Sequence, residues 1–93
     1  MKLYPETGQL RLRDGYQRQL RRREAQILNC LFRYQGSIVS RQMMIDEVWK
    51  TQTAIPTSET LDVYIRRLRM ALGSQSGIIK TVRGFGYSLA DGE

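Results

Sequence analysis

The amino-acid sequence predicts an α+β domain in which short strands come first, three helices follow, and a β-hairpin ends the chain. Two changes of pattern carry this prediction. Near the N-terminus apolar residues alternate with charged ones, as in a half-buried strand, whereas from Arg22 onward they recur every three or four residues, as in an amphipathic helix. After Ile78 strand-like segments return around Gly84-Phe85-Gly86, which suits a tight hairpin.

Length and composition favour one domain over residues 1–93. A chain of 93 residues lies near the lower end of sizes that bury a core of their own, and its 41% hydrophobic content is ordinary. No apolar run approaches the roughly 20 residues that cross a bilayer. The opening MKLYPETG lacks the apolar core of a signal peptide. We therefore expect a soluble, cytoplasmic protein with no membrane partner.

Charge is the most informative part of the composition. Fifteen basic residues against nine acidic ones give a net charge of +6, and twelve of the fifteen are arginines. Guanidinium groups fit phosphates and the guanine edge, whereas lysine acts more as a point charge. A basic domain favours nucleic acid or an anionic membrane surface as its partner, although a charge of +6 alone also fits a protein that is merely kept soluble.

An enzyme is the function class that the sequence supports least. Histidine, the commonest general base near neutral pH, is absent. Cys30 lies within a helical apolar pattern and is interpreted as a core residue, and one cysteine makes neither an internal disulfide nor a zinc site. The nine carboxylates are scattered without metal-loop spacing. We expect no catalytic residue, no cofactor and no metal.

Residues 1–20 are predicted to form an N-terminal sheet. Leucines alternate with arginines over residues 10–13, Asp14-Gly15 is a turn signal, and a second strand follows. Lys2–Tyr4 is a candidate edge strand, with Gly8 at the turn after it.

The helical period over residues 22–35 and 41–50 predicts two helices. The apolar face of the first comprises Ala25, Ile27, Leu28, Leu31 and Phe32. Gly36 suits its left-handed end, and a very short strand is expected at residues 38–39. Ser40 is a good N-cap for the second helix. The inner side of that helix comprises Met44, Ile45, Val48 and Trp49. Residues 51–58 form a polar loop.

A third helix, over residues 58–72, is expected to begin at Thr57 or Ser58 as N-cap and to stop at Gly73. On a helical wheel at about 100° per residue, one arc is aliphatic and is interpreted as the core side. It consists of Leu61, Ile65, Leu68 and Leu72, flanked by Tyr64 and Ala71. The opposite side carries Glu59, Val63, Arg66, Arg67 and Met70, with Asp62 and Arg69 at one border.

This outward side has two interpretations. An ordinary solvated face would hold Asp62 and Arg66 as an i,i+4 ion pair, but it gives no reason for Val63 and Met70 among arginines. A helix in the major groove of DNA accounts for both, because arginine reaches phosphate and guanine while valine meets the thymine methyl. A helix lying on a membrane would need large apolar residues here.

The C-terminal hairpin joins strands over residues 78–83 and 86–89. Its Gly84-Phe85-Gly86 lacks a third glycine and precedes no helix, so it does not support a nucleotide-binding loop. Arg83 at the tip is placed to enter a minor groove or to contact a phosphate, although a merely exposed arginine also fits.

Two segments carry a resemblance to a known family: DVYIRRLR at residues 62–69 and TVRGFGY at residues 81–87. They resemble the OmpR/PhoB-type winged-helix effector domain of bacterial response regulators, with further matches at Leu20, Glu24 and Val48-Trp49. The resemblance covers nearly the whole chain. It implies a winged helix-turn-helix with a four-stranded N-terminal sheet (1–20), a three-helix core (21–73) and a hairpin wing (78–89).

By this resemblance the helix over residues 58–72 is a recognition helix in the major groove, and residues 80–87 are a wing in the minor groove. The implied DNA-binding residues are Val63, Tyr64, Arg66, Arg67, Arg69, Thr81, Arg83 and Tyr87. Tyr64 would lie nearer the border, and Thr81 and Tyr87 would be neighbours of phosphates. Members often bind direct repeats as head-to-tail dimers, and the 50–57 loop resembles a segment that contacts RNA polymerase or partner subunits.

The sequence departs from the family at three places. The usual Leu-Thr-Pro before the first helix is replaced by Leu20 and three arginines at residues 21–23, which removes a threonine N-cap worth roughly 1 kcal/mol. These arginines could contact the DNA backbone or a partner, or be solvated, and we favour the last. Ser58-Glu59 and Met70 stand where relatives carry basic residues, so phosphate contacts are expected to be missing there.

The leading hypothesis is sequence-specific binding of double-stranded DNA by the output domain of a bacterial transcription regulator of a two-component system. The alternatives are a winged-helix module that docks on another protein and an RNA-binding winged helix, which would lack an aromatic stacking platform. Because 93 residues cannot hold a receiver domain beside this module, the chain is either an excised output domain or a receiver-free regulator.

Overall fold

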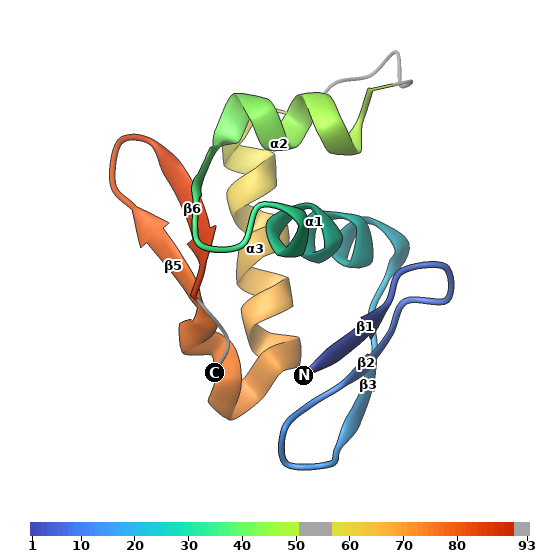
Figure 1. Cartoon of the computed structure of the whole chain (residues 1–93). Coiled ribbons are helices and arrows are strands. Elements are labelled where there is room, and N and C mark those ends of the chain that lie inside the picture. Colours follow the sequence, from blue (N-terminus) through green and yellow to red (C-terminus); the bar gives the residue numbers. More distant parts are fainter. Residues whose placement is uncertain (51–56, 91–93) are drawn as a thin grey trace.

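The computed structural model describes residues 1–50 and 57–90. The elements follow in the order β1 (Lys2–Tyr4), β2 (Gln9–Arg11), β3 (Gln17–Gln19), α1 (Arg22–Arg33), β4 (Ile38–Ser40), α2 (Arg41–Val48), α3 (Ser58–Leu72), the 3-10 helix η1 (Gly73–Ile78), β5 (Ile79–Val82) and β6 (Gly86–Leu89). The α+β order expected from the sequence is confirmed. The helices lie between two small sheets, one at each side of the molecule (Figure 1).

The N-terminal sheet is antiparallel in the order β1-β2-β3. Leu10 in β2 is fully buried, while all three residues of β3 are exposed. Gly8 has a positive φ of 78°, and an added Cβ would lie 2.6 Å from the carbonyl oxygen of Leu20, so this turn requires glycine. The implied fourth strand is wrong for the described residues, because the chain turns into α1 directly after Leu20.

Helix α1 starts without the side-chain cap that the arginines displaced. Arg21 occupies the N-cap, and its backbone N–H donates to the Glu24 carboxylate (3.2 Å), so the glutamate half of a capping box remains. The predicted apolar face is buried, with Phe32 half-buried. The helix ends two residues before the expected position 35, and α2 likewise ends at Val48 rather than at residue 50.

The caps of the other two helices agree with the sequence. Ser40 accepts a hydrogen bond from the backbone of Met43 (3.0 Å), and Thr57 accepts one from Thr60 (3.2 Å), which decides between the two expected caps of α3. Gly73 ends α3 with a φ of 59°. The loop expected after it is the 3-10 helix η1. In the described part of the chain, no helix has the length and apolar character needed to cross a membrane.

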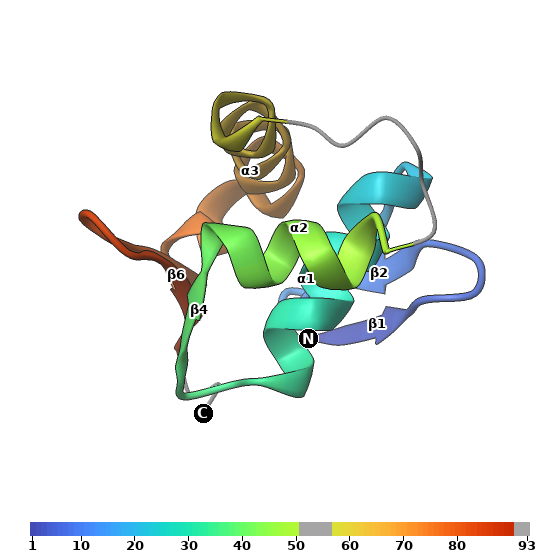
Figure 2. The same ribbon diagram turned by 90° about the horizontal axis from the view of Figure 1, so that it is seen from above.

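The second sheet has the strand order β4-β6-β5, so the strand between α1 and α2 is part of the wing. Ser40 pairs with Gly86 in the antiparallel register of β4 and β6. A Cβ on Gly86 would overlap the carbonyl oxygen of Val39 and lie 2.9 Å from Cα of Ser40, so only glycine permits this close approach. Viewed from above, the wing hairpin projects away from the helices (Figure 2).

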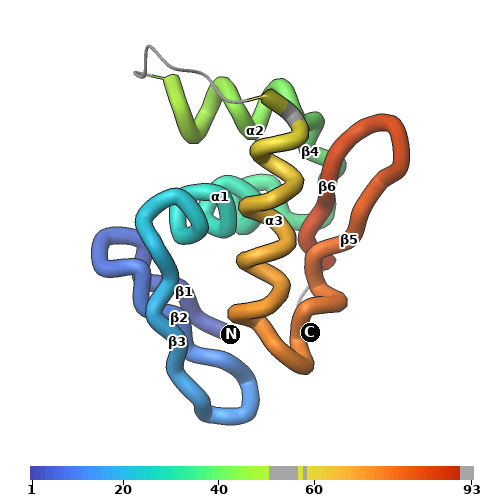
Figure 3. The backbone as a smooth tube through the Cα atoms, turned by 180° about the vertical axis from the view of Figure 1, so that it is seen from behind, coloured from blue at the N-terminus to red at the C-terminus, as the bar shows by residue number. Residues whose placement is uncertain are grey.

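One hydrophobic core joins the helices to both sheets. Its fully buried members come from α1, α2, α3 and strands of both sheets: Leu10, Ile27, Leu28, Leu31, Val39, Met44, Leu61, Ile65, Leu68, Leu72 and Leu89. Helix α3 therefore has the sheet of β1–β3 on one side and the wing on the other, with one face left outward (Figure 3).

Candidate nucleic-acid interface

The two sides of α3 are those that the helical wheel predicts. Leu61, Ile65, Leu68 and Leu72 are all at most 1% exposed. On the opposite side Arg66 and Arg67 are exposed and Val63 is half-buried. Met70 is 75% exposed. The outward face thus combines two exposed arginines with apolar side chains.

Tyr64 lies at the border of this face, as expected. Its ring packs against Trp49 at the end of α2, with centroids 5.7 Å apart, and the guanidinium of Arg67 lies 5.8 Å from the same ring. This cation–π contact helps to orient Arg67, one of the two exposed arginines of the outward face.

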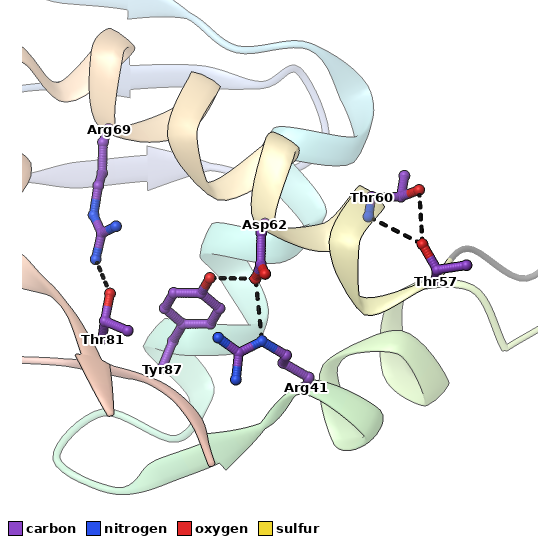
Figure 4. Close-up of polar contacts among 7 residues, drawn as sticks. All are labelled: Arg41, Thr57, Thr60, Asp62, Arg69, Thr81 and Tyr87. Atoms are coloured by element: carbon purple, nitrogen blue, oxygen red, sulfur yellow. Dashed lines mark hydrogen bonds and ion pairs between the residues drawn. The ribbon is translucent and has the colours of Figure 1, made fainter. Parts of the chain in front are cut away.

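Asp62 does not form the i,i+4 pair with Arg66 that an ordinary solvated face would hold. Its Oδ1 atom instead accepts hydrogen bonds from Nε of Arg41 (3.1 Å) and from the hydroxyl of Tyr87 (Figure 4). That pair considers α3 alone, whereas in the folded domain Arg41 of α2 and Tyr87 of β6 both donate to the Asp62 carboxylate. Asp62 therefore ties three elements together, and Arg66 projects freely from α3.

Arg69 is likewise engaged by the wing. One of its terminal nitrogens donates to the carbonyl of Ile79 (2.7 Å) and to Oγ1 of Thr81 (2.8 Å), as Figure 4 shows for Thr81. Its guanidinium also lies 5.8 Å from the ring of Tyr87, and that of Arg41 lies 5.0 Å from it. The predicted residues Arg69, Thr81 and Tyr87 are thus brought together at the junction of α3 and the wing.

Tyr87 is 4% exposed, so its ring belongs to the core while its hydroxyl reaches the junction. Burial, followed by the hydrogen bond to Asp62, raises the pKa of this phenol above its usual range. The separate hydrogen bond from Arg41 to Asp62 raises the pKa of Arg41. Both groups therefore keep their protons across the physiological range.

The wing presents a basic and an aromatic side chain at its turn. Arg83 is exposed, Gly84 has a positive φ of 81°, and Phe85 is 68% exposed. The backbone N–H of Phe85 donates to the carbonyl of Val82 (2.9 Å), which closes the turn. The predicted wing residue therefore stands at the tip of a tight hairpin, beside an unexpected aromatic ring.

The arginines at residues 21–23 are not all solvated, contrary to the interpretation we favoured. Arg21 and Arg22 are exposed. Arg23, however, donates to the carbonyl of Val48 (3.1 Å) and lies 5.0 Å from the ring of Trp49. It links the start of α1 to the end of α2, a contact that a single-helix pattern does not reveal. The 51–56 part of the 50–57 loop lies outside the described residues.

The described residues contain no group of three His, Cys, Asp or Glu side chains that could hold a metal ion. Cys30 is 3% exposed and unpaired. Burial, with a smaller contribution from Glu47, raises the pKa of its thiol to about 11. The thiol is therefore neutral at ordinary pH, which agrees with its interpretation as a core residue.

Sequence reasoning missed Arg41 and Trp49 as parts of this region. The helical period indicates only that Arg41 begins a helix and that Trp49 lies on its inner side, because it relates residues within one helix and not between helices. The sequence does contain one signal for Arg41. It directly follows the predicted N-cap Ser40 and the expected strand at residues 38–39, which places its positive charge where that strand meets the second helix.

Comparison with known proteins agrees with this geometry. A family model described as "Transcriptional regulatory protein, C terminal" matches residues 15–89. Among curated relatives, the transcriptional regulatory protein CutR of Streptomyces coelicolor is 33% identical over 89 residues, which cover 96% of this chain and 40% of that protein. The chain spans between 28% and 40% of the length of the curated relatives that it matches.

Solved structures share the fold. The C-terminal domain of the nisin resistance regulator NsrR has a TM-score of 0.82 and 29% identity, with 95% of this chain and 88% of that chain covered. The DNA-binding domain of Escherichia coli CadC has a TM-score of 0.78 and 30% identity, with 91% and 80% covered. The winged helix-turn-helix architecture is confirmed. The chain therefore belongs to the family of C-terminal domains of transcriptional regulatory proteins, the OmpR/PhoB-type effector domains.

Proposed function

We propose that this domain binds double-stranded DNA in a sequence-specific manner, as the output domain of a bacterial transcription regulator. The observation that carries the proposal is that two elements with exposed arginines are joined by direct hydrogen bonds. Exposed Arg66 and Arg67 of α3 and exposed Arg83 of the wing belong to elements that Asp62 and Arg69 lock together. Family membership and the likeness to the DNA-binding domain of CadC support the same function.

In this proposal α3 lies in the major groove and residues 80–87 lie along the adjacent minor groove. Arg66 and Arg67 read base edges, and Val63 contacts a thymine methyl. Arg83 enters the minor groove, where a narrow groove attracts arginine. Tyr64, Arg69, Thr81 and Tyr87 lie nearer the sugar-phosphate strands, where they fix the register of the domain rather than read bases.

The partners follow from the same proposal. Binding of chromosomal DNA assigns the domain to the cytoplasm, and an operator of direct repeats would hold two copies head to tail, with affinity gained by tandem sites. The 50–57 loop is the segment that we assign to RNA polymerase.

Selection of bound sequences from a random duplex pool, followed by affinity measurements, tests this function. Replacing Arg66 or Arg67 by alanine is expected to weaken binding by ~1–3 kcal/mol and to change the preferred base at one position. Replacing Arg83 should weaken binding more evenly across sequences. Arg18→Ala, an exposed arginine of β3, serves as the control.

Two results would contradict the proposal. Equal binding of wild type and the Arg66, Arg67 and Arg83 variants to the selected duplex would remove these residues from the interface. Retention on neither heparin nor random duplex across a salt gradient would remove DNA altogether, and would favour a domain that docks on another protein.

A further inference from the structure

Arg41 occupies the meeting point of the two DNA-facing elements of the proposed function. It is the first residue of α2 and directly follows β4, the strand that pairs with β6 of the wing. Its backbone N–H donates to the carbonyl of Phe85 at the wing turn (3.3 Å), and its side chain reaches Asp62 of α3 (Figure 4). One residue thus contacts both α3 and the wing.

The guanidinium of Arg41 is oriented but not fully used. Its plane lies over the ring of Tyr87, and its Nε donates to Asp62. The hydroxyl of Tyr87 is a second polar neighbour of the guanidinium, and within the described residues no carboxylate other than Asp62 pairs with it. The side chain keeps 26% of its surface exposed. A guanidinium fixed in this way loses little further freedom when it binds an anion.

The charge of the junction favours such an anion. Asp62 contributes one carboxylate, whereas Arg41 and Arg69 contribute two guanidinium groups that lie within 6 Å of the Tyr87 ring, at 5.0 and 5.8 Å. The local balance is therefore positive although Asp62 is paired. A carboxylate that binds Nε of an arginine leaves the terminal nitrogens of the guanidinium to meet a phosphate.

A helix in the major groove and a wing in the adjacent minor groove lie on either side of one sugar-phosphate strand, since that strand separates the grooves. We propose that Arg41 is a phosphate-binding residue for this strand, and that Asp62 and Tyr87 act as positioning residues that orient its guanidinium. The inference rests on the proposed function. It adds a contact from α2 to those assigned to α3 and the wing.

The salt dependence of binding to a duplex of mixed sequence, measured by fluorescence anisotropy, tests the proposal. Loss of one phosphate contact reduces the slope of log K against log salt concentration by about 0.9. Arg41→Gln should show this reduction and weaken all sequences alike, whereas Arg41→Lys, which keeps the charge, should keep the slope near that of wild type. Arg18→Gln removes the same charge from β3 and should leave the slope unchanged.

A wild-type slope in folded Arg41→Gln, with or without lower affinity, would overturn the proposal and leave a structural role for Arg41. Absence of salt-dependent binding by the wild type would instead contradict the proposed function itself. A second measurement needs no substitution: the Nη–H signals of Arg41 in ¹⁵N-labelled wild-type protein should shift when the duplex is added. Shifts of Arg66 without any shift of Arg41 would also overturn it.

Discussion

The two sheets at the sides of the helices both have three antiparallel strands, but they are attached in different ways. The β1–β3 sheet is held through aliphatic residues, with Leu10, Leu12 and Leu20 in the core and every residue of β3 exposed. The wing sheet adds polar links to α3, because Asp62 accepts from Tyr87 and Arg69 donates to β5.

This difference shows why directional contacts are useful between two elements that bind one ligand together. Apolar packing is non-directional, so it holds the N-terminal sheet without defining its angle sharply. Hydrogen bonds to charged groups have narrow geometry and define the angle between α3 and the wing. The N-terminal sheet should therefore contribute to stability, and the wing sheet to both stability and DNA affinity.

The largest expected effect concerns the apolar attachment. Leu10→Ala removes a fully buried side chain and should lower the free energy of unfolding by about 3 kcal/mol. The DNA affinity of the folded fraction should stay at the wild-type value. Urea denaturation followed by circular dichroism measures the first quantity. Ile38→Ala, a 59% exposed residue of the wing sheet, is the control and should change stability by at most about 0.5 kcal/mol.

Gly86→Ala should be nearly as damaging, because its Cβ would overlap the carbonyl oxygen of Val39. Overpacking of this kind typically costs about 1–3 kcal/mol, and we expect the upper end. Here DNA affinity should fall as well, since β4 and β6 must separate. Gly77→Ala meets no atom within 4 Å and serves as a matched control. Unchanged DNA binding by folded Gly86→Ala would break the comparison.

A smaller and more specific effect is expected from Tyr87→Phe, which keeps the ring and removes the donor to Asp62. A hydrogen bond to a charged group contributes about 1.5–3 kcal/mol when buried, and the partial exposure of Asp62 places this one at about 1 kcal/mol. Tyr16→Phe removes a hydroxyl just before β3, from a side chain that is 64% exposed, and should have no effect. Equal melting temperatures of the two variants would show that the polar link contributes nothing.

The smallest effect is expected at Cys30 in α1, outside both sheets. Because its thiol pKa is raised to about 11, the thiolate is scarce in the folded protein at pH 8, and a thiol reagent should react only after unfolding. The thiolate fraction of the folded protein, and with it the labelling rate, should grow as pH rises toward about 11. Above the pKa of the unfolded thiol, folding stability should fall with rising pH, because the folded state then binds more protons than the unfolded one. Rapid labelling at pH 8 would contradict the burial.

Local signals in the sequence were sufficient for most of the fold. Periodicity and turn chemistry could locate features that depend only on neighbours in the chain. These are the apolar stripe of α3, the Ser40 cap, the helix end at Gly73 and the hairpin turn at Gly84. The pairing of β4 with β6 could not be predicted, because it joins segments almost fifty residues apart that carry no matching local signal.

The candidate site divides in the same way. Exposure of Arg66 and Arg67 follows from the wheel, whereas the partners of Asp62 and Arg69 lie on other elements. A helical wheel pairs Asp62 with Arg66 because they are four residues apart. In the structure the Asp62 carboxylate instead accepts hydrogen bonds from side chains of α2 and β6. The assignment of DNA contacts to individual residues stays a prediction.

The membership of β4 in the wing sheet has a consequence for protein engineering. A wing exchanged between relatives as residues 79–89 alone would transfer β5 and β6 but not β4. The incoming strand would then have to fit against Val39 and Ser40, which approach Gly86 closely in this domain. A graft that includes Ile38–Ser40 would carry the complete sheet. The exchangeable unit of recognition is therefore discontinuous in the chain, and a chimera designed on sequence segments alone would cut it in two.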